Sequence, residues 1–160
     1  MRFGSLGQRP IMAQKKSKLS VLRFAGLDSF ADHGLVIMRV GLGLMFALYH
    51  GWPKLIDGPD GWHRIGRAVS YLGIHGGYTV WGFLAAVLEC GGGVCLVLGF
   101  AARPVALALA GEMCVAALWS YFRYFPFGGW SQAAHPFELA IVFLGLFYLG
   151  PGKYSLDSQL

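Results

Sequence analysis

The chain has 160 residues, enough for a single domain, and its composition excludes an ordinary water-soluble protein. Hydrophobic residues make up 56% of the sequence and charged residues 13%, whereas soluble globular domains carry about 25% charged residues. The formal net charge is +5 and the mean hydropathy is +0.54. So few polar side chains cannot cover a water-soluble globule of this size, and we therefore expect the surrounding solvent to be lipid.

A basic tail precedes the first apolar segment. Residues 1–33 carry six basic side chains against two aspartates, and they contain no apolar run typical of a cleavable signal peptide. The positive-inside rule predicts a cytoplasmic tail, and four crossings would return the C-terminus to the same side of a bacterial-type inner membrane. This orientation accounts for the basic charge, so we expect no nucleic-acid partner. The sequence leaves open whether translation starts at Met1 or at Met12.

Four apolar segments follow the tail, at roughly residues 34–54, 80–100, 103–122 and 135–149. Each approaches the ~20 residues that cross a bilayer as a helix. Pro104 and Pro136 suit the first turns of the third and fourth helices. Backbone groups in lipid must be bonded internally, which favours helices over open strands. We therefore predict an all-α fold, a four-helix transmembrane bundle.

The segment between the first two predicted spans has its own pattern. Trp62, Ile65, Val69 and Leu72 recur at helical spacing. This spacing predicts a short amphipathic helix lying in the membrane interface. An ordinary polar loop with incidental periodicity is the alternative.

Ionisable residues interrupt the apolar segments at membrane depth. A charged side chain costs about 2.5–3.5 kcal/mol at the centre of a spanning helix. We therefore expect Arg39, Glu89 and Glu112 to face the bundle interior, with at least one ion pair between the arginine and a glutamate. Nearer the outer side, Lys54 or His50 is placed to pair with Glu138.

The helical spacing brings these polar groups together from four segments. We expect a cavity open to the outer leaflet, which is where ligand sites form between bundle helices. Its predicted lining and rim, taken as the candidate ligand-binding residues, are His50, Lys54, Trp81, Glu89, Glu112, Trp119 and Glu138. The alternative is that these charges hold the helices together and bind nothing.

Several motifs resemble the DoxX family of small four-helix membrane proteins. They are RVGLGLMFALYHGWPKL, LECGGGVCLVLGFAARP, LAGEMCVAALW and HPFELAIVFLGLFYLGPGKYSLD, and the likeness covers residues 34–157. The resemblance implies a membrane subunit associated with redox enzymes, or a protein of membrane-protein assembly. It marks five positions as the family-like polar residues: His50, Lys54, Glu89, Glu112 and Glu138.

Two functional hypotheses follow from the residues and the resemblance. In the first, the chain is a membrane subunit of a redox-associated complex, such as a quinone-linked oxidoreductase, and binds a quinone or similar lipid-soluble molecule. In the second, it is a non-catalytic scaffold or assembly factor; transport of a small solute is a third reading. The sequence has no haem, flavin or metal motif. The expected partners are the lipid bilayer and either a redox enzyme or a second copy of the chain.

Overall fold

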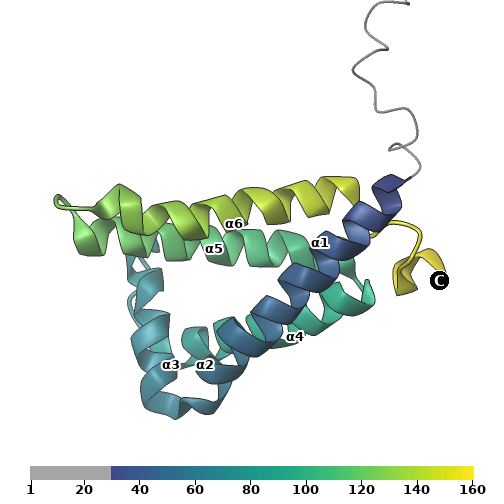
Figure 1. Ribbon diagram of the computed structural model, residues 1–160. Coiled ribbons are helices and arrows are strands. Elements are labelled where there is room, and N and C mark those ends of the chain that lie inside the picture. The colour runs from purple at the N-terminus through teal and green to yellow at the C-terminus, as the bar shows by residue number, and fades with distance from the viewer. Residues whose placement is uncertain (1–29) are drawn as a thin grey trace, which may run out of the picture. The chain divides into compact units, whose positions relative to one another are not determined.

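The computed structural model describes residues 30–160 (Figure 1). The predictions about the basic tail fall largely on residues 1–29 and lie outside the described residues. The described part contains helices and no strands. In chain order the helical elements are α1 (Ala31–Met45), η3 (Phe46–Gly51), α2 (Trp52–Ile56), α3 (Gly58–Gly66), η4 (Arg67–Leu72), α4 (Tyr78–Leu98), α5 (Ala102–Tyr124), α6 (Gly129–Leu149) and η5 (Leu156–Ser158).

Four helical stretches are long and apolar enough to cross a membrane, which confirms the predicted fold class. They are Ala31–Ile56, called here the first span, and then α4, α5 and α6. The first span is a continuous run of α1, η3 and α2. The segment between the first span and α4 is helical, formed by α3 and η4, so the predicted short helix is present rather than the alternative loop.

The fourth helix begins earlier than predicted. It starts at Gly129, and Pro136 lies inside it, so the placement of this proline in the first turn was wrong. Residues 130–135 contain no helix-breaking residue, and the chain therefore enters the helix directly after the glycines at 128 and 129. An internal proline removes one backbone hydrogen bond, which membrane helices tolerate when neighbouring groups compensate.

A π-helical turn widens the first span near its end. The turn η3 comprises Phe46–Gly51, and both of these terminal residues are buried. In a π-helix the backbone bonds join residues five apart, so Phe46 and Gly51 share the inward face. The turn therefore brings a glycine to the helix contact just before Lys54.

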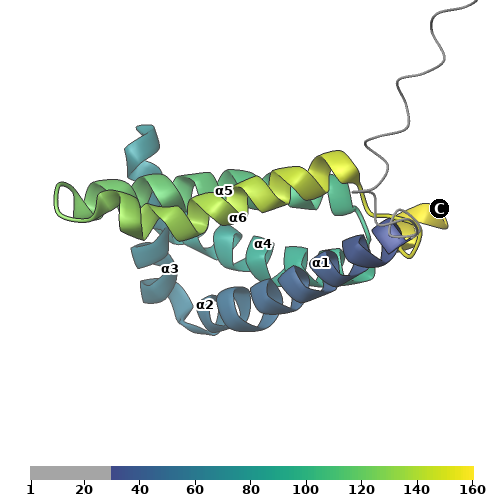
Figure 2. The ribbon, with the colours of Figure 1, turned by 45° about the horizontal axis from the view of Figure 1, so that its top comes forward.

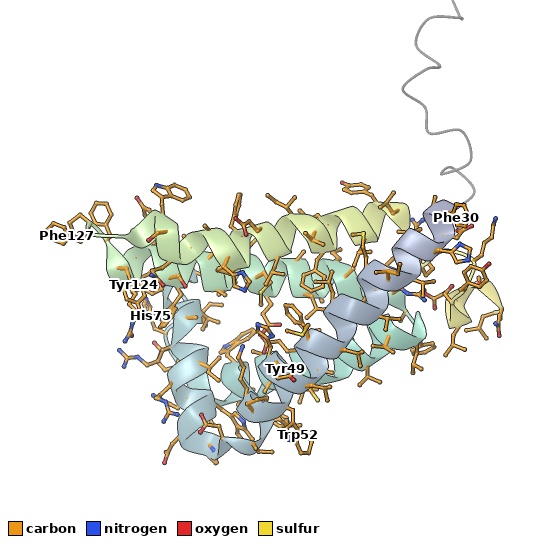
Figure 3. All side chains as sticks on the ribbon, in the orientation of Figure 1. Phe30, Tyr49, Trp52, His75, Tyr124 and Phe127 are labelled. Carbon is orange, nitrogen blue, oxygen red and sulfur yellow. The ribbon has the colours of Figure 1, made fainter. Side chains whose placement is uncertain are left out.

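The central helix is α4, which packs against η3, α2, α3 and α5. The helices α5 and α6 run side by side in both views (Figures 1 and 2). The interior is rich in alanine, whereas large apolar side chains such as Ile37, Leu48 and Tyr148 face outward. Labelled aromatic residues such as Tyr49, Trp52 and Phe127 likewise project away from the helices (Figure 3). Small residues inside and large apolar residues outside suit a bundle surrounded by lipid.

Two glycines permit close helix contacts around α4. A side chain at Gly51 would collide with the backbone of Cys90, so the first span can approach α4 only because this residue is glycine. A side chain at Gly82 would collide with the backbone of Trp62 in α3. These contacts hold the end of the first span and α3 close to α4, and the contact of Gly51 with Cys90 lies next to Glu89 in the sequence.

The C-terminal segment, residues 150–160, closes the end of the bundle where the first span begins. Asp157 accepts hydrogen bonds from the backbone N–H groups of Ala101 and Ala102, at 2.7 and 2.9 Å, and so caps the start of α5. Lys153 pairs with Asp32 at 2.9 Å. The hydrogen bond with the Asp32 carboxylate raises the pKa of Lys153.

Candidate functional site

A lysine–glutamate pair joins the first span to α4. The Lys54 ammonium nitrogen lies 2.5 Å from Oε1 of Glu89. The Glu89 side chain is 0% exposed, and the Lys54 side chain is 31% exposed. The carboxylate is therefore deep in the protein while the lysine stem reaches it from a more open space. A buried carboxylate needs such a partner because desolvation of an unpaired charge is costly.

A second carboxylate, Glu112 of α5, lies close enough to Glu89 and Lys54 for their charges to interact. Oε2 of Glu89 and Oε2 of Glu112 are both buried and have no hydrogen-bond partner among the described residues. The Lys54 ammonium group thus bonds one carboxylate, Glu89, and attracts the second, Glu112. A proton or a hydrogen-bond donor from a bound molecule would satisfy the remaining oxygen atoms.

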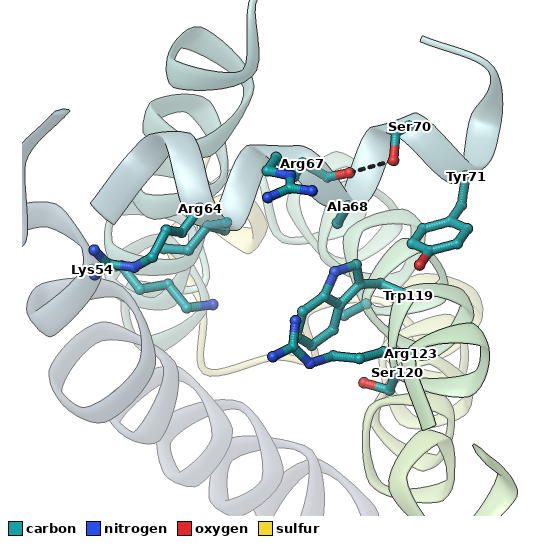
Figure 4. A pocket seen from close by; sticks show the side chains of 11 residues that line it. Lys54, Arg64, Arg67, Ala68, Ser70, Tyr71, Trp119, Ser120 and Arg123 are labelled. Atoms are coloured by element: carbon teal, nitrogen blue, oxygen red, sulfur yellow. Dashed lines mark hydrogen bonds between the residues drawn. The ribbon is translucent and has the colours of Figure 1, made fainter. Parts of the chain in front are cut away.

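Lys54 also lines a cavity of about 580 Å³, which we call the cationic pocket. It is bordered by the first span, by α3 with η4, and by α5 (Figure 4). Its lining residues are Lys54, Arg64, Ile65, Arg67, Ala68, Ser70, Tyr71, Ala116, Trp119, Ser120 and Arg123. Four of these carry positive charge and none carries negative charge. The pocket therefore favours electron-rich or anionic groups.

The pocket and the buried carboxylates are connected through two elements. Lys54 lines the pocket and also holds Glu89. On α5, Ala116 and Ser120 line the pocket at four-residue spacing, and Glu112 continues the same face one turn further along. One turn is about 5–6 Å of helix, so the second carboxylate lies just beyond the lined wall.

The structure separates the predicted ligand-binding residues into two groups. Lys54 and Trp119 line the pocket, and Glu89 and Glu112 lie beyond it. The other three residues, His50, Trp81 and Glu138, do not line it.

Each of those three residues has a different environment. His50 stacks on Phe46 with ring centroids 4.8 Å apart, and its Nδ1 lies 3.2 Å from the backbone oxygen of Met45. Trp81 is exposed on α4, and Glu138 is exposed on α6. The predicted pairing of Lys54 or His50 with Glu138 is therefore wrong, because Lys54 turns to the buried Glu89 instead.

The predicted ion pair between Arg39 and a glutamate is also wrong. Arg39 is buried, but it donates hydrogen bonds to the backbone oxygens of Pro151 at 2.5 Å and Tyr154 at 2.6 Å. Its partners are carbonyl groups of the C-terminal segment, near the beginning of the first span. Lys54, 15 residues further along the chain, supplies the positive charge for Glu89.

The sequence reasoning missed the arginines of the pocket. Arg64 and Arg67 come from α3 and η4, and Arg123 comes from the end of α5. Arg64 and Arg67 are three residues apart, on the polar side of the predicted amphipathic helix, which was the available signal. Nothing in the sequence placed Arg123 beside them. No group of three or more potential metal ligands lies among residues 30–160.

Comparison with known protein families gives a match over the part of the chain that contains the buried polar cluster. A model of the DoxX family matches residues 34–121. This range contains the first span from Gly34 onward, α4, and α5 as far as Tyr121, together with Lys54, Glu89 and Glu112. No curated protein and no solved structure matches the chain. The four apolar helices make the chain a multi-pass membrane protein. Because the family match covers more than half of its length, the chain belongs to the DoxX family.

Proposed function

We propose that this protein is the membrane subunit of a redox-associated complex and binds a quinone or similar lipid-soluble molecule in the cationic pocket. The observation that carries the proposal is the connection between the pocket and the buried carboxylates. Lys54 lines the cavity while it bonds Glu89, and Glu89 and Glu112 each have a buried oxygen atom without a hydrogen-bond partner among residues 30–160. Unsatisfied buried oxygens next to a cavity favour a bound group that completes their hydrogen bonds.

The lining suits the parts of a quinone. The Trp119 ring offers an aromatic wall, and the hydroxyl groups of Ser120 and Tyr71 can donate to carbonyl oxygens, as can the Lys54 ammonium group. Reduction of a quinone to a quinol takes up two electrons and two protons. In the proposed complex a redox partner enzyme supplies the electrons, and Glu112 passes protons from one side of the cavity.

Retention of a quinone by the purified protein tests this proposal directly. The purified protein would be extracted with organic solvent and the extract analysed for quinones by chromatography and mass spectrometry. We expect Glu112→Gln and Trp119→Leu to lose the quinone. The first variant removes the carboxylate that exchanges protons with the quinone, and the second removes the aromatic ring that the quinone packs against. The matched controls are Glu138→Gln and Trp81→Leu, which alter exposed residues outside the pocket and should retain it. A wild-type protein purified without any quinone would count against the proposal.

A scaffold or assembly role is the second candidate. The observation in its favour is the close packing at Gly51 and Gly82, since the Lys54–Glu89 pair could serve only to join the same helices. This role predicts that loss of the pair releases a partner protein while no small molecule is found. Co-purification of partner proteins with the wild type and with Glu112→Gln would separate the two functions.

The proposal includes the inner membrane and an orientation with both chain ends in the cytoplasm. Its support is the set of six basic residues before the first span, under the positive-inside rule. Ser17→Cys and Ser158→Cys variants test it by labelling of intact cells with an impermeant thiol reagent. Labelling of either position from outside the cell would contradict the proposed orientation. The native thiols Cys90, Cys95 and Cys114 require a cysteine-free background.

A further inference from the structure

We propose that the mouth of the cationic pocket binds the phosphate group of an anionic phospholipid through Arg67 and Arg123. This inference goes beyond the proposed quinone function and does not depend on it. It starts from the four positive side chains of the pocket, which differ in whether they already have an ion-pair partner.

Two of the four cations already have carboxylate partners. Lys54 pairs with Glu89, and Arg64 pairs with Asp57 at 2.8 Å. Arg67 and Arg123 form no ion pair with any residue that the structure describes. The Arg123 guanidinium lies over the Trp119 ring, 4.9 Å from its centroid, which orients the charge without neutralising it. Two arginines therefore remain available for an anion.

The side chains of Arg67 and Arg123 extend toward the same space from two different elements (Figure 4). A guanidinium group presents a planar set of N–H donors that matches phosphate oxygens, often with two parallel hydrogen bonds. The chemistry of the mouth is thus that of a phosphate site.

The surroundings favour a lipid as the source of that phosphate. The pocket lies near the end of membrane-spanning helices, where headgroups are found. Beside it, Tyr71 and Phe122 stack with ring centroids 5.4 Å apart, and both are exposed, as is Leu72. These apolar side chains offer a surface for acyl chains directly next to the arginines. A free phosphate ion would use the arginines and leave this surface without a role.

Native mass spectrometry of the full-length protein in detergent tests the proposal. Phosphatidylglycerol and phosphatidylcholine with identical acyl chains would be titrated separately, with inorganic phosphate as a third ligand. We expect phosphatidylglycerol to bind more tightly than phosphatidylcholine. Each of Arg67→Gln and Arg123→Gln should weaken phosphatidylglycerol binding by about fivefold, the effect of one basic residue near an anionic lipid surface.

Control variants separate this site from general surface charge. Arg103→Gln removes one positive charge near the opposite end of the bundle, at the start of α5, and should leave binding unchanged. Arg123→Lys keeps the charge and should retain most of the lipid preference even if Arg123→Gln disturbs the Trp119 contact. Equal binding of the two lipids, or equal losses in Arg103→Gln and Arg67→Gln, would overturn the proposal. Competition by inorganic phosphate at similar concentration would overturn the lipid assignment.

None of these outcomes depends on quinone retention. The lipid preference can fail while a quinone remains bound, and a protein without quinone can still prefer phosphatidylglycerol. The two proposals therefore fail independently.

Discussion

Replacing Lys54 with methionine should destabilise the bundle more than removal of any exposed charge. The substitution keeps most of the side-chain volume but leaves the Glu89 carboxylate, which is 0% exposed, without its cation. The second carboxylate oxygen of Glu89 already has no hydrogen-bond partner among the described residues. Removal of Lys54 therefore leaves both oxygen atoms unsatisfied in the interior.

The size of the effect follows from the burial of the two partners. Breaking a buried ion pair from one side costs about 3–5 kcal/mol. Lys54 is 31% exposed, and a stranded carboxyl group can take up a proton, so we expect the lower end, about 3 kcal/mol. For a chain of this length each kcal/mol shifts the melting temperature by about 2–4 °C, which gives a loss of roughly 6–12 °C.

Thermal melting in detergent, followed by circular dichroism, measures this loss. Lys153→Met is the matched control, because the Lys153 side chain is 81% exposed and its pairing with Asp32 is largely solvated. The double variant Lys54→Met with Glu89→Met should recover the stability lost by Lys54→Met, since it removes the stranded charge. The reasoning is refuted if Lys54→Met melts like Lys153→Met, or if the double variant is no more stable than Lys54→Met alone.

Three further predictions concern the C-terminal segment. Arg39→Met should increase hydrogen–deuterium exchange in residues 151–158 and leave exchange in α6 unchanged, because it removes the two bonds to backbone carbonyls. Asp157→Asn should cost about 1 kcal/mol in thermal melting, since the carboxylate caps α5. The pKa of Lys153 is raised by the Asp32 hydrogen bond, so this contribution is complete below the unfolded-state pKa and is lost as the pH rises through the folded-state pKa. Melting temperatures of Lys153→Gln and wild type should therefore converge as the pH increases through the alkaline range.

The fold was predictable because its main signal is strong and local. Long apolar segments with few charges specify spanning helices whatever the details of packing, and residues 80–100 and 103–122 agree closely with α4 and α5. The start of α6 was less predictable. Pro136 is equally compatible with a first turn and with an internal position that membrane helices tolerate, and the sequence alone does not choose between them.

The site was predictable only in part. The sequence indicates which charged side chains are buried, but not which groups they contact. The inward position of Glu89 follows from its burial cost, but its partner depends on how two helices meet. Arg39 shows the difficulty most clearly: charge-pairing arguments consider carboxylates, whereas its partners are carbonyl groups that every residue carries. Arg123 joins the pocket through the packing of α5 against η4, a contact between residues far apart in the sequence.

The apolar double variant also separates a binding role from a packing role. Buried ion pairs are often replaced by apolar residues of similar volume without loss of stability, so stability alone is weak evidence for why a protein keeps one. If Lys54 and Glu89 only joined the first span to α4, the variant with methionine at both positions would keep every property of the wild type. We expect it to melt near or above the wild-type temperature and yet to retain no quinone, because the donor at the pocket wall and the carboxylate beyond it are gone. Solvent extraction of the purified wild type and of the double variant measures the amount of quinone that each retains. Equal retention would mean that the Lys54–Glu89 pair serves packing alone, and would favour the scaffold function.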